Sequence, residues 1–593
     1  MQYRHEIDGL RAVAVLPVIF FHAGASAFSG GFVGVDVFFV ISGYLITSII
    51  LNDLGSERGF SIARFYERRA RRILPALYFV MLASTVASWF LLVPDQLENY
   101  GQSLVATTLF ANNLLLAYTT GYWDILIELK PLVHTWSLSV EEQFYVIFPL
   151  IMVAMAKRSR KAAVWLFIFL ALVSLAAAEW GVRNLDSGHY YLPHSRAWEL
   201  LIGALCAYAL KHRVPVRNDG AALLGVAMVG YAIFAFDGNT PFPSAWGLIP
   251  VIGTALIILF ATNDSWVGRA LSWRPIVGIG LISYSAYLWH QPIFAFARSY
   301  LKDRPAPFTL ILLTPVILLL AYLSWRYVEA PFRDRRRVGM KGLIWFAVPA
   351  SLAFTLVGAA FHISHGAPAR ISLERLKGDR SSDYNPTAFS FKRDAFATRK
   401  PVKLLVIGDS FGRDAVNMVK ETFGTDHIEI VYRDDMHDCF ADIQAGSVFA
   451  SLLMQSDTII VSRRENFDTN CLDPSIAWAE EHGKTYFIFG TKSFGTNINW
   501  ITQMPKGKRA MLYNLPDPDL MIIAERMKRT VPAANYIDVM GRIMNGDRVP
   551  FTDEAGSLLS DDTRHLTRAG AIYVGKRALN DLRIRSALEA SDR

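Results

Sequence analysis

Long apolar runs, separated by short polar gaps, fill the first 361 of the 593 residues. A helix that crosses a membrane needs about 20 mostly apolar residues. Runs of this kind predict spans at 9–28, 31–51, 73–93, 144–156, 162–178, 195–210, 220–236, 246–261, 276–297, 308–327 and 343–361. Residues 101–118 are a weaker candidate, because Asn112 and Asn113 interrupt the run. The pattern predicts a polytopic α-helical membrane domain of ten spans, with an eleventh span linking it to the rest of the chain.

The pattern changes to that of a soluble α/β domain after about residue 366. Five short apolar stretches predict strands, and the stretches between them have helical periodicity. The predicted strands are 402–409, 427–432, 457–462, 484–490 and 535–540. Alternating strands and helices are typical of a doubly wound α/β fold. We therefore expect a membrane domain at 1–337, a linking helix at 338–365, a polar linker at 366–400 and an α/β domain at 401–593.

Basic residues gather in the gaps between predicted spans. The clusters lie at 58–72, 157–161, 211–217 and 333–341. Because cytoplasmic loops are rich in Lys and Arg, all four are expected on the cytoplasmic side. Eleven spans with a cytoplasmic N-terminus satisfy this if 101–118 is re-entrant or interfacial, and the α/β domain then lies outside the cytoplasm. These clusters account for the net charge of +8, so no nucleic-acid partner is expected.

Ionisable side chains inside apolar segments are costly and usually functional. The first predicted span carries Arg11 near its cytoplasmic end and His22 near its outer end, roughly 16 Å apart along a helix. The stretch 134–149 enters its span from outside. Its ionisable residues His134, Glu141 and Glu142 are expected at the level of His22, together with Asp36 of the second span; Arg68, Arg69, Arg71 and Arg72 mark the cytoplasmic end of the third span. Arginines at a membrane edge also snorkel or set topology without further function.

An acyl-transfer site fed from the cytoplasm accounts for this arrangement. Arginine binds phosphate through a planar fork, so the inner arginines suit the nucleotide end of coenzyme A. A pantetheine arm is similar in length to the Arg11–His22 separation, which places the thioester near His22. His22 is then the general base toward an acceptor hydroxyl or the carrier of the acyl group. Glu142 or Asp36 is the candidate that orients its ring.

Several motifs resemble those of the acyltransferase 3 family of membrane acyltransferases. They are "IDGLRAVAVLPVIFFHAG", "GGFVGVDVFFVISGYLIT", "FYERRARRILPA", "WSLSVEEQFYVIFP", "YSAYLWHQP" and "YVEAPFR", in family order over roughly residues 1–337. By this resemblance the family's arginine–ten residues–histidine motif falls on Arg11 and His22, its RxxR motif on Arg68/Arg71 or Arg69/Arg72, and its carboxylate motif on Glu141 and Glu142.

The resemblance also implies the reaction and its place. It implies transfer of an acetyl group from cytoplasmic acetyl-coenzyme A, without a metal, to a glycan outside the cytoplasmic (inner) membrane of a bacterium. Lipopolysaccharide O-antigen, exopolysaccharide and peptidoglycan are the acceptors that fit. The alternative is a secondary transporter that exports a lipid-linked glycan and carries an esterase domain. Intramembrane charges fit that function too, but the chain has no convincing pair of repeats.

The α/β domain carries a candidate serine nucleophile. Ser410 follows the first predicted strand and precedes a helix, whose N–H groups can hold an oxyanion. Asp562 and His565 lie near the end of the chain, in "DDTRHLTRAG". The pattern resembles the SGNH hydrolase fold over roughly residues 401–590, which implies a Ser410–His565–Asp562 triad that completes acyl transfer. The family's Gly-x-Asn-Asp block is missing; its expected place reads "VSRRENFD", where Arg463, Arg464 and Asn466 are substitute donors, and Gly446 is a candidate for the second-block glycine.

Two of the three cysteines, Cys439 and Cys471, lie in the α/β domain. If that domain is extracytoplasmic, a disulfide between them is favoured. Two unrelated thiols fit the sequence equally well.

Overall fold

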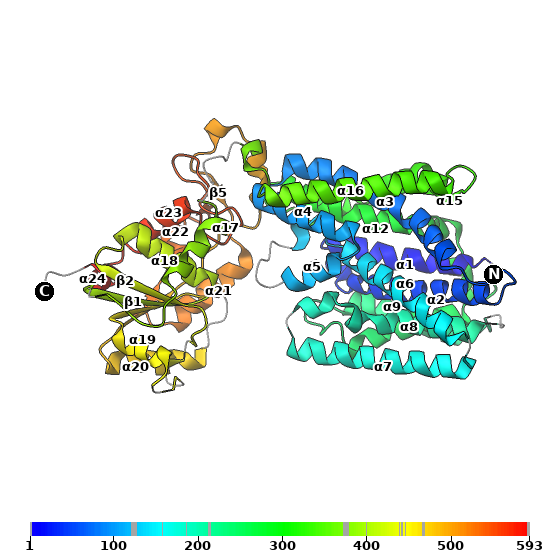
Figure 1. Ribbon diagram of the computed structural model, residues 1–593, viewed down its shortest axis with the longest axis horizontal. Coiled ribbons are helices and arrows are strands. Elements are labelled where there is room, and N and C mark those ends of the chain that lie inside the picture. Colours follow the sequence, from blue (N-terminus) through cyan, green and yellow to red (C-terminus); the bar gives the residue numbers. More distant parts are fainter. Residues whose placement is uncertain are drawn as a thin grey trace. The chain divides into compact units, whose positions relative to one another are not determined.

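A computed structural model describes residues 3–119, 127–156, 158–185, 187–211, 215–371, 379–398, 400–437, 439–440, 443–444, 446–464 and 469–589. The chain forms two compact units, one of helices and one built on a sheet (Figure 1). The helical unit comprises Met1–Phe90, Gln96–Arg298 and Pro305–Gly366; the sheet unit comprises Leu91–Asp95, Ser299–Arg304 and Ala367–Arg593. The predicted order of a helical domain and an α/β domain is therefore confirmed.

All eleven predicted spans fall on helices. The helices up to residue 210 are α1 (His5–His22), α2 (Gly34–Leu54), α3 (Ile62–Leu91), α4 (Pro94–Thr108), α5 (Asn112–Thr119), α6 (Thr135–Met155), α7 (Arg160–Asn184) and α8 (Pro193–Leu210). They are followed by α9 (Asp219–Ala235), α10 (Leu248–Phe260), α11 (Trp266–Leu271), α12 (Arg274–Tyr300), α13 (Pro307–Ile311), α14 (Thr314–Ser324), a π-helical turn (Trp325–Glu329), α15 (Ala330–Arg333) and α16 (Met340–Ile363).

Six helical segments in the described part of the chain are long and apolar enough to cross a membrane. These are Gly31–Leu54, Ile62–Leu91, Thr135–Met155, Arg160–Asn184, Pro307–Arg333 and Met340–Ile363. Two further apolar helices, Asp219–Ala235 and Ala245–Phe260, are shorter. These lengths and compositions indicate a multi-pass membrane protein.

The doubtful segment 101–118 does not form one continuous helix. Helix α4 ends at Thr108 and α5 begins at Asn112, as the two asparagines predicted. The Asn112 amide donates to the carbonyl oxygen of Leu132 (3.0 Å) and to Oγ1 of Thr135 (2.9 Å). The Asn113 amide donates to the carbonyl oxygen of Tyr191 (3.2 Å). Both asparagines are buried, so these hydrogen bonds satisfy polar groups that would otherwise oppose burial.

Helices α2 and α8 pack in close backbone contact. A Cβ atom on Gly43 would lie 1.9 Å from the carbonyl oxygen of Leu200, and one on Gly203 would lie 2.0 Å from that of Val40. Small residues at such points let helices approach without a side chain between them. This contact holds α2, which contributes to both cavities described below.

The sheet unit is a parallel α/β structure. Its five-stranded sheet has the order β2-β1-β3-β4-β6. The strands are β1 (Val402–Ile407), β2 (Ile428–Arg433), β3 (Thr458–Val461), β4 (Thr485–Phe489) and β6 (Tyr536–Ile537). A separate antiparallel pair joins β5 (Tyr513–Asn514) to β7 (Val549–Pro550). All five predicted strands are confirmed.

Helices cover both faces of this sheet (Figure 1). Leu404 and Val406 of β1 share a core with α18 (Ser410–Phe423) and α23 (Arg568–Ala578). Leu405 and Ile407 point the other way, toward α19 (Val448–Gln455) and α20 (Leu472–Glu481). The remaining helices are α17 (Ser381–Tyr384), α21 (Pro518–Thr530), α22 (Val539–Ile543) and α24 (Leu582–Leu588). This two-sided cover is the predicted doubly wound arrangement.

The predicted linker at 366–400 is not a free connection. Within it, residues 379–398 pack on the sheet unit through α17 and a 3-10 helix, Asn385–Phe391. Tyr384 and Ala388 are buried in the same core as β1. The boundary of the α/β domain therefore lies earlier than residue 401. The apolar side chains of this segment supply the physical reason, because they bury surface against α18.

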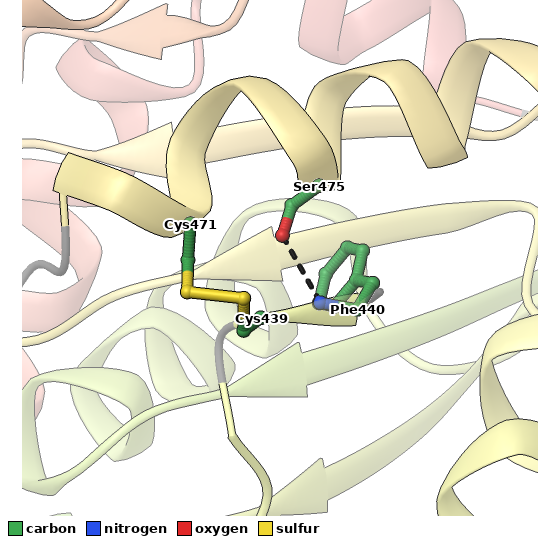
Figure 2. The surroundings of a disulfide bond; sticks show 4 residues. All are labelled: Cys439, Phe440, Cys471 and Ser475. Carbon is green, nitrogen blue, oxygen red and sulfur yellow. Dashed lines mark hydrogen bonds between the residues drawn. A yellow bond between two sulfur atoms is a disulfide. The ribbon is translucent and has the colours of Figure 1, made fainter. Parts of the chain in front are cut away.

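A disulfide joins Cys439 to Cys471 (Figure 2), which resolves the alternatives left by the sequence. Their Cα atoms are 4.8 Å apart and 32 positions separate them in sequence. Cys471 directly precedes α20, and Oγ of Ser475 on that helix accepts a hydrogen bond from the backbone N–H of Phe440 (3.1 Å). The disulfide therefore fixes the 439–440 segment to the start of α20.

Replacing Cys439 and Cys471 together with serine is expected to lower the free energy of unfolding of the sheet unit by about 2–4 kcal/mol, because the unfolded chain gains loop entropy. The measurement is thermal unfolding of the full-length protein in detergent, with and without reductant. Reductant should lower the wild-type midpoint and leave that of the variant unchanged. A wild-type protein whose two thiols are free in non-reducing mass spectrometry would contradict the assignment; Cys206→Ala is the control for loss of a thiol elsewhere.

Candidate functional site

A cavity of about 90 Å³ lies among helices α1, α2, α3, α6 and α12, and three arginines line it. We call it the arginine cavity. Its polar lining consists of Arg11, Arg69, Arg72, Ser42, Ser137, Glu141, Tyr145, Ser283, Tyr284 and Tyr287. Three guanidinium groups in one small cavity form a site suited to an anion with several oxygen atoms.

Of the two pairs of arginines that fit the RxxR motif, one pair lines the cavity. Arg69 and Arg72 line it, and they lie on one face of α3 because they are three residues apart. Arg68 instead pairs with Asp53 at 2.7 Å, and its side chain is 36% exposed. Arg71 is buried and donates to Glu67 and to the backbone carbonyl oxygens of residues 332 and 338. The Arg69/Arg72 register is therefore the one that faces the cavity.

The two glutamates of α6 lie with the arginines, not with His22. Oε1 of Glu141 accepts a hydrogen bond from Ser42 (2.9 Å), and Oε2 accepts one from Tyr145 (3.2 Å). Glu142 interacts electrostatically with Arg69 and, among the described residues, makes no contact with His22. The expectation that Glu141 and Glu142 share the level of His22 was wrong, because seven or eight residues of helix carry them roughly 10 Å or more below His134.

A second cavity, of about 310 Å³, contains His22 and His134, and we call it the histidine cavity. Most of its remaining walls are aromatic: Phe21, Phe32, Trp136, Tyr190, Tyr191, Phe242 and Tyr287. Val35 and Tyr287 line both the histidine cavity and the arginine cavity. The two cavities therefore adjoin at these side chains, with Arg11 on one side and His22 on the other.

His22 is the last residue of α1, and α12 holds it on two sides. Its Nδ1 lies 3.0 Å from the carbonyl oxygen of Val18 and 3.3 Å from Nε2 of His290. Its carbonyl oxygen accepts a hydrogen bond from Arg298 (2.5 Å), so that a cation lies at the C-terminal end of α1. Sequence reasoning missed His290 and Arg298. A histidine inside the apolar run "YSAYLWHQP" was the available signal for the first.

Asp36 does not orient His22, contrary to the expectation. Its Oδ1 lies 3.2 Å from Nη2 of Arg196, whose Nη1 lies 3.1 Å from Oε1 of Glu199. All three side chains are fully buried. The Arg196 guanidinium also lies 5.2–5.6 Å from the ring centres of four aromatic residues: Phe39, Trp136, Tyr190 and Phe242. A buried arginine is stable only with such partners. Asp36 therefore stays paired with Arg196 and does not contact His22.

The sheet unit brings the three predicted triad residues together. Ser410 begins α18 directly after β1, and His565 and Asp562 lie in the segment before α23. Nε2 of His565 is 2.7 Å from Oγ of Ser410, and Nδ1 of His565 is 2.5 Å from Oδ2 of Asp562. Oδ1 of Asp562 accepts the backbone N–H groups of Arg564 (2.8 Å) and His565 (2.7 Å). This geometry is that of a serine nucleophile with its base and the group that orients the base.

The charges in this triad reinforce one another. Burial alone would lower the pKa of His565, but the Asp562 carboxylate outweighs it and raises the pKa above its ordinary value of about 6.5. Burial likewise opposes ionisation of Asp562, but the attraction of His565 and the hydrogen bonds lower its pKa below the ordinary range. Asp562 is therefore ionised, and its negative charge favours the protonated form of His565.

The backbone around Ser410 is fixed from three directions. Gly408 has a φ of 157°, and a Cβ atom there would lie 1.9 Å from the carbonyl oxygen of Ser462. Tyr432 donates to the carbonyl oxygen of Gly408 (2.9 Å). The Asn385 amide, from the segment predicted as a linker, donates to the carbonyl oxygen of Ser410 (2.8 Å). Glycine at 408 therefore permits the close passage of β1 beside β3.

The candidate oxyanion donors have different positions. Arg463 donates through its guanidinium to the carbonyl oxygen of Met436 (2.9 Å). The backbone N–H of Arg464 donates to Oδ2 of Asp409 (3.2 Å), the residue before Ser410, which places this segment beside the serine. Gly446 has a left-handed conformation (φ 81°) in the turn before α19. Asn466 lies outside the described residues. Among those that are described, no group of three or more His, Cys, Asp or Glu side chains could hold a metal ion.

The chain is similar to one protein family and to several curated proteins. The family model described as "Acyltransferase domain" (Acyl_transf_3) matches residues 4–326. The chain is 32% identical over 350 residues to "Peptidoglycan O-acetyltransferase OatA" of Listeria monocytogenes, covering 56% of this chain and 56% of that protein. It is 34% identical over 355 residues to "Putative peptidoglycan O-acetyltransferase YrhL" of Bacillus subtilis, covering 56% and 55%.

A protein of Staphylococcus aureus, "Putative O-acetyltransferase SAS0844", is 31% identical over 363 residues, covering 58% of this chain and 59% of that protein. The chain thus spans rather more than half the length of the curated relatives it matches. No solved structure matches it significantly. The family match takes in Arg11, His22, Arg69 and Arg72, and it covers more than half of the chain. The chain therefore belongs to the acyltransferase 3 family.

Proposed function

We propose that this protein is a membrane O-acetyltransferase, which moves an acetyl group from cytoplasmic acetyl-coenzyme A to a hydroxyl group of a glycan outside the cytoplasm. The observation that carries the proposal is the pair of adjoining cavities, with arginines in one and histidines in the other. Family membership and the printed names of the relatives support the reaction type. The names of two relatives favour peptidoglycan over O-antigen as the acceptor class.

In this proposal the protein lies in the cytoplasmic membrane of a bacterium, with eleven spans and a cytoplasmic N-terminus. The distribution of basic clusters supports that orientation. The sheet unit is then extracytoplasmic. Its disulfide supports this placement, because such bonds persist in oxidising compartments and are rare in the cytosol.

The arginine cavity is the donor end of the proposed site. Arg11, Arg69 and Arg72 bind phosphate oxygens of coenzyme A. Hydrogen bonds from Ser42 and Tyr145 fix the position of the Glu141 carboxylate. The pantetheine arm extends past Val35 and Tyr287 toward His22. Arg11 and His22 are eleven residues apart on α1, or roughly 16 Å along its axis. The thioester carbonyl thereby reaches the histidine cavity while the nucleotide stays on the cytoplasmic side.

His22 performs the first proton transfer or the first acyl transfer. As base, it takes the proton of the acceptor hydroxyl while the oxygen attacks the thioester carbonyl; the C–S bond breaks, and the thiolate of coenzyme A receives the proton. As carrier, its free nitrogen attacks the thioester carbonyl, the C–S bond breaks, and coenzyme A leaves as the thiolate; the acceptor hydroxyl then attacks acetyl-His22, the C–N bond breaks, and the hydroxyl proton passes to the thiolate. Both routes need an uncharged imidazole nitrogen that faces the cavity.

The sheet unit completes the transfer in this proposal. Here Ser410 is the hydroxyl that receives the acetyl group: it attacks the acetyl carbonyl, its proton passes to His565 and on to the leaving group, and the bond between that group and the acetyl carbon breaks, which gives acetyl-Ser410. His565, uncharged again, then takes the proton of a glycan hydroxyl as that oxygen attacks the ester; the ester C–O bond breaks, and the serine oxygen receives the proton. The assembled triad supports this step. A glycan exporter with an attached esterase remains the alternative, but family membership supports acyl transfer over export.

Replacing Arg69 or Arg72 with glutamine is expected to raise the KM for acetyl-coenzyme A by about 10-fold or more, because each loses a charged hydrogen bond to phosphate. Steady-state release of coenzyme A by the protein in proteoliposomes measures this. Arg68→Gln is the matched control, since its side chain pairs with Asp53 at the surface, and its KM should stay within about twofold of wild type. The reverse result would contradict the assignment of the donor end.

A further inference from the structure

We infer that His290 is a positioning residue, which fixes the proton of His22 on Nδ1 and leaves Nε2 of His22 bare toward the histidine cavity. The inference rests on the proposed function of His22 and deepens it. It concerns a contact between α1 and α12, both in the helical unit.

The tautomer of His290 follows from its own partner. Its Nδ1 lies 2.6 Å from the carbonyl oxygen of Tyr287, and a carbonyl oxygen only accepts hydrogen bonds. Nδ1 of His290 therefore carries a hydrogen. The residue is fully buried, which favours the uncharged ring. Nε2 of His290 then bears a lone pair and acts as an acceptor.

The tautomer of His22 follows in the same way. Its Nδ1 lies 3.0 Å from the carbonyl oxygen of Val18 and 3.3 Å from Nε2 of His290. Both partners are acceptors, so Nδ1 of His22 is the donor to both. Nε2 of His22 has no hydrogen-bond partner among the described residues, and His22 lines the histidine cavity. The nitrogen that can take a proton or an acetyl group is therefore Nε2.

The arrangement is rigid because α12 is tied to α6 at the same level. The Tyr287 hydroxyl donates to the carbonyl oxygen of His134 (2.9 Å), and it lies 2.7 Å from Oγ of Ser137. The ring of His290 lies 5.3 Å from that of His134 and 5.1 Å from that of His22. These contacts keep the acceptor nitrogen of His290 in place when the acyl donor enters.

A neutral acceptor in this position explains why His22 makes no contact with a carboxylate of the described residues. In a serine-hydrolase triad the acidic residue holds the tautomer of the catalytic histidine and stabilises its protonated form. Here Asp36 is bound to Arg196 and Glu141 to Ser42, and a second imidazole takes over the orienting function. Val18 and His290 together accept the N–H of a protonated His22, so its charge keeps two polar partners.

The test compares two variants of full-length protein in proteoliposomes, with acetyl-coenzyme A as donor. His290→Leu removes the acceptor nitrogen, and kcat should fall by about 100-fold while the KM for acetyl-coenzyme A stays within about twofold. His290→Gln offers an amide oxygen at the position of Nε2 and should restore at least a tenth of wild-type kcat. Trp289→Phe is the matched control: it removes a buried hydrogen bond to Ser324 (2.7 Å) from the same helix and should leave kcat unchanged.

A double-mutant cycle separates positioning from general support of the fold. In a His22→Ala background, His290→Leu should cause no further loss, because it acts through His22. Equal loss in the leucine and glutamine variants, or a further loss in the alanine background, would overturn the inference. An active His22→Ala protein would instead overturn the proposed function of His22. An inactive His22→Ala protein with a fully active His290→Leu protein would overturn the inference alone.

Discussion

Replacing His22 with alanine is expected to abolish O-acetylation of the surface glycan. The variant lacks the imidazole at the end of α1, which lines the histidine cavity and also hydrogen-bonds to His290. Loss of a general base lowers a rate by about 10²–10⁴-fold, and loss of an acyl carrier removes the route altogether. The measurement is NMR of the isolated glycan from cells with the wild-type or variant protein, which gives the acyl group, its position and its amount.

Two further readouts make this result specific. The amount of variant protein in the membrane and the total amount of exported glycan should match the wild type. Normal acetylation of a reduced quantity of glycan would contradict the proposal and favour an exporter. Trp289→Phe again serves as the control for damage to α12 packing, and it should leave acetylation unchanged.

Replacing Ser410 with alanine is expected to have the second largest effect. If the acetyl group passes through acetyl-Ser410, glycan acetylation falls by at least about 10³-fold, since a triad without its nucleophile retains little catalysis. The same NMR measurement applies, and acetyl-coenzyme A turnover in proteoliposomes shows whether the helical unit still works. Unchanged glycan acetylation in the Ser410→Ala strain would place the serine outside the transfer path.

The pH dependence of this step has a defined sign. His565 must be uncharged to accept the serine proton, and Asp562 raises the pKa of His565. The rate of the serine step should therefore fall as the pH drops, with a half-point above the ordinary histidine value of about 6.5. Asp562→Asn removes the raising charge and should move the half-point to lower pH, while also lowering the maximum rate. A half-point that stays in place would contradict the role of Asp562.

The periodicity of apolar residues predicted the helices and strands well, because the spacing of these residues follows the face of each element that is buried. The strand β1 alternates Leu404 and Val406 on one face with Leu405 and Ile407 on the other, and each pair reaches a separate core. The triad could be predicted from the sequence equally well. The serine lies between a strand and a helix, and the Asp-x-x-His motif lies near the end of the chain. The doubly wound order of strands and helices is enough to bring the two close together.

Contacts between the helices of the membrane domain could not be predicted in the same way. Hydropathy places a residue along the membrane normal, but it does not give the rotation of a helix about its own axis. Asp36 therefore faces Arg196, and Arg69 rather than Arg68 faces the arginine cavity, for reasons that lie in the packing of neighbouring helices. The segment 379–398 was misjudged because it is polar in composition, although Tyr384 and Ala388 are buried.

The aromatic side chains that form the wall of the histidine cavity also pack against the buried charge of Arg196. Trp136, Tyr190 and Phe242 line that cavity, and they also surround Arg196. A substitution that enlarges the cavity for a bulkier acceptor therefore also uncovers an arginine that water cannot reach. A change of acceptor in this family therefore requires joint substitutions. The aromatic wall and Arg196 must change together, and Asp36 and Glu199, which pair with Arg196, must change with them.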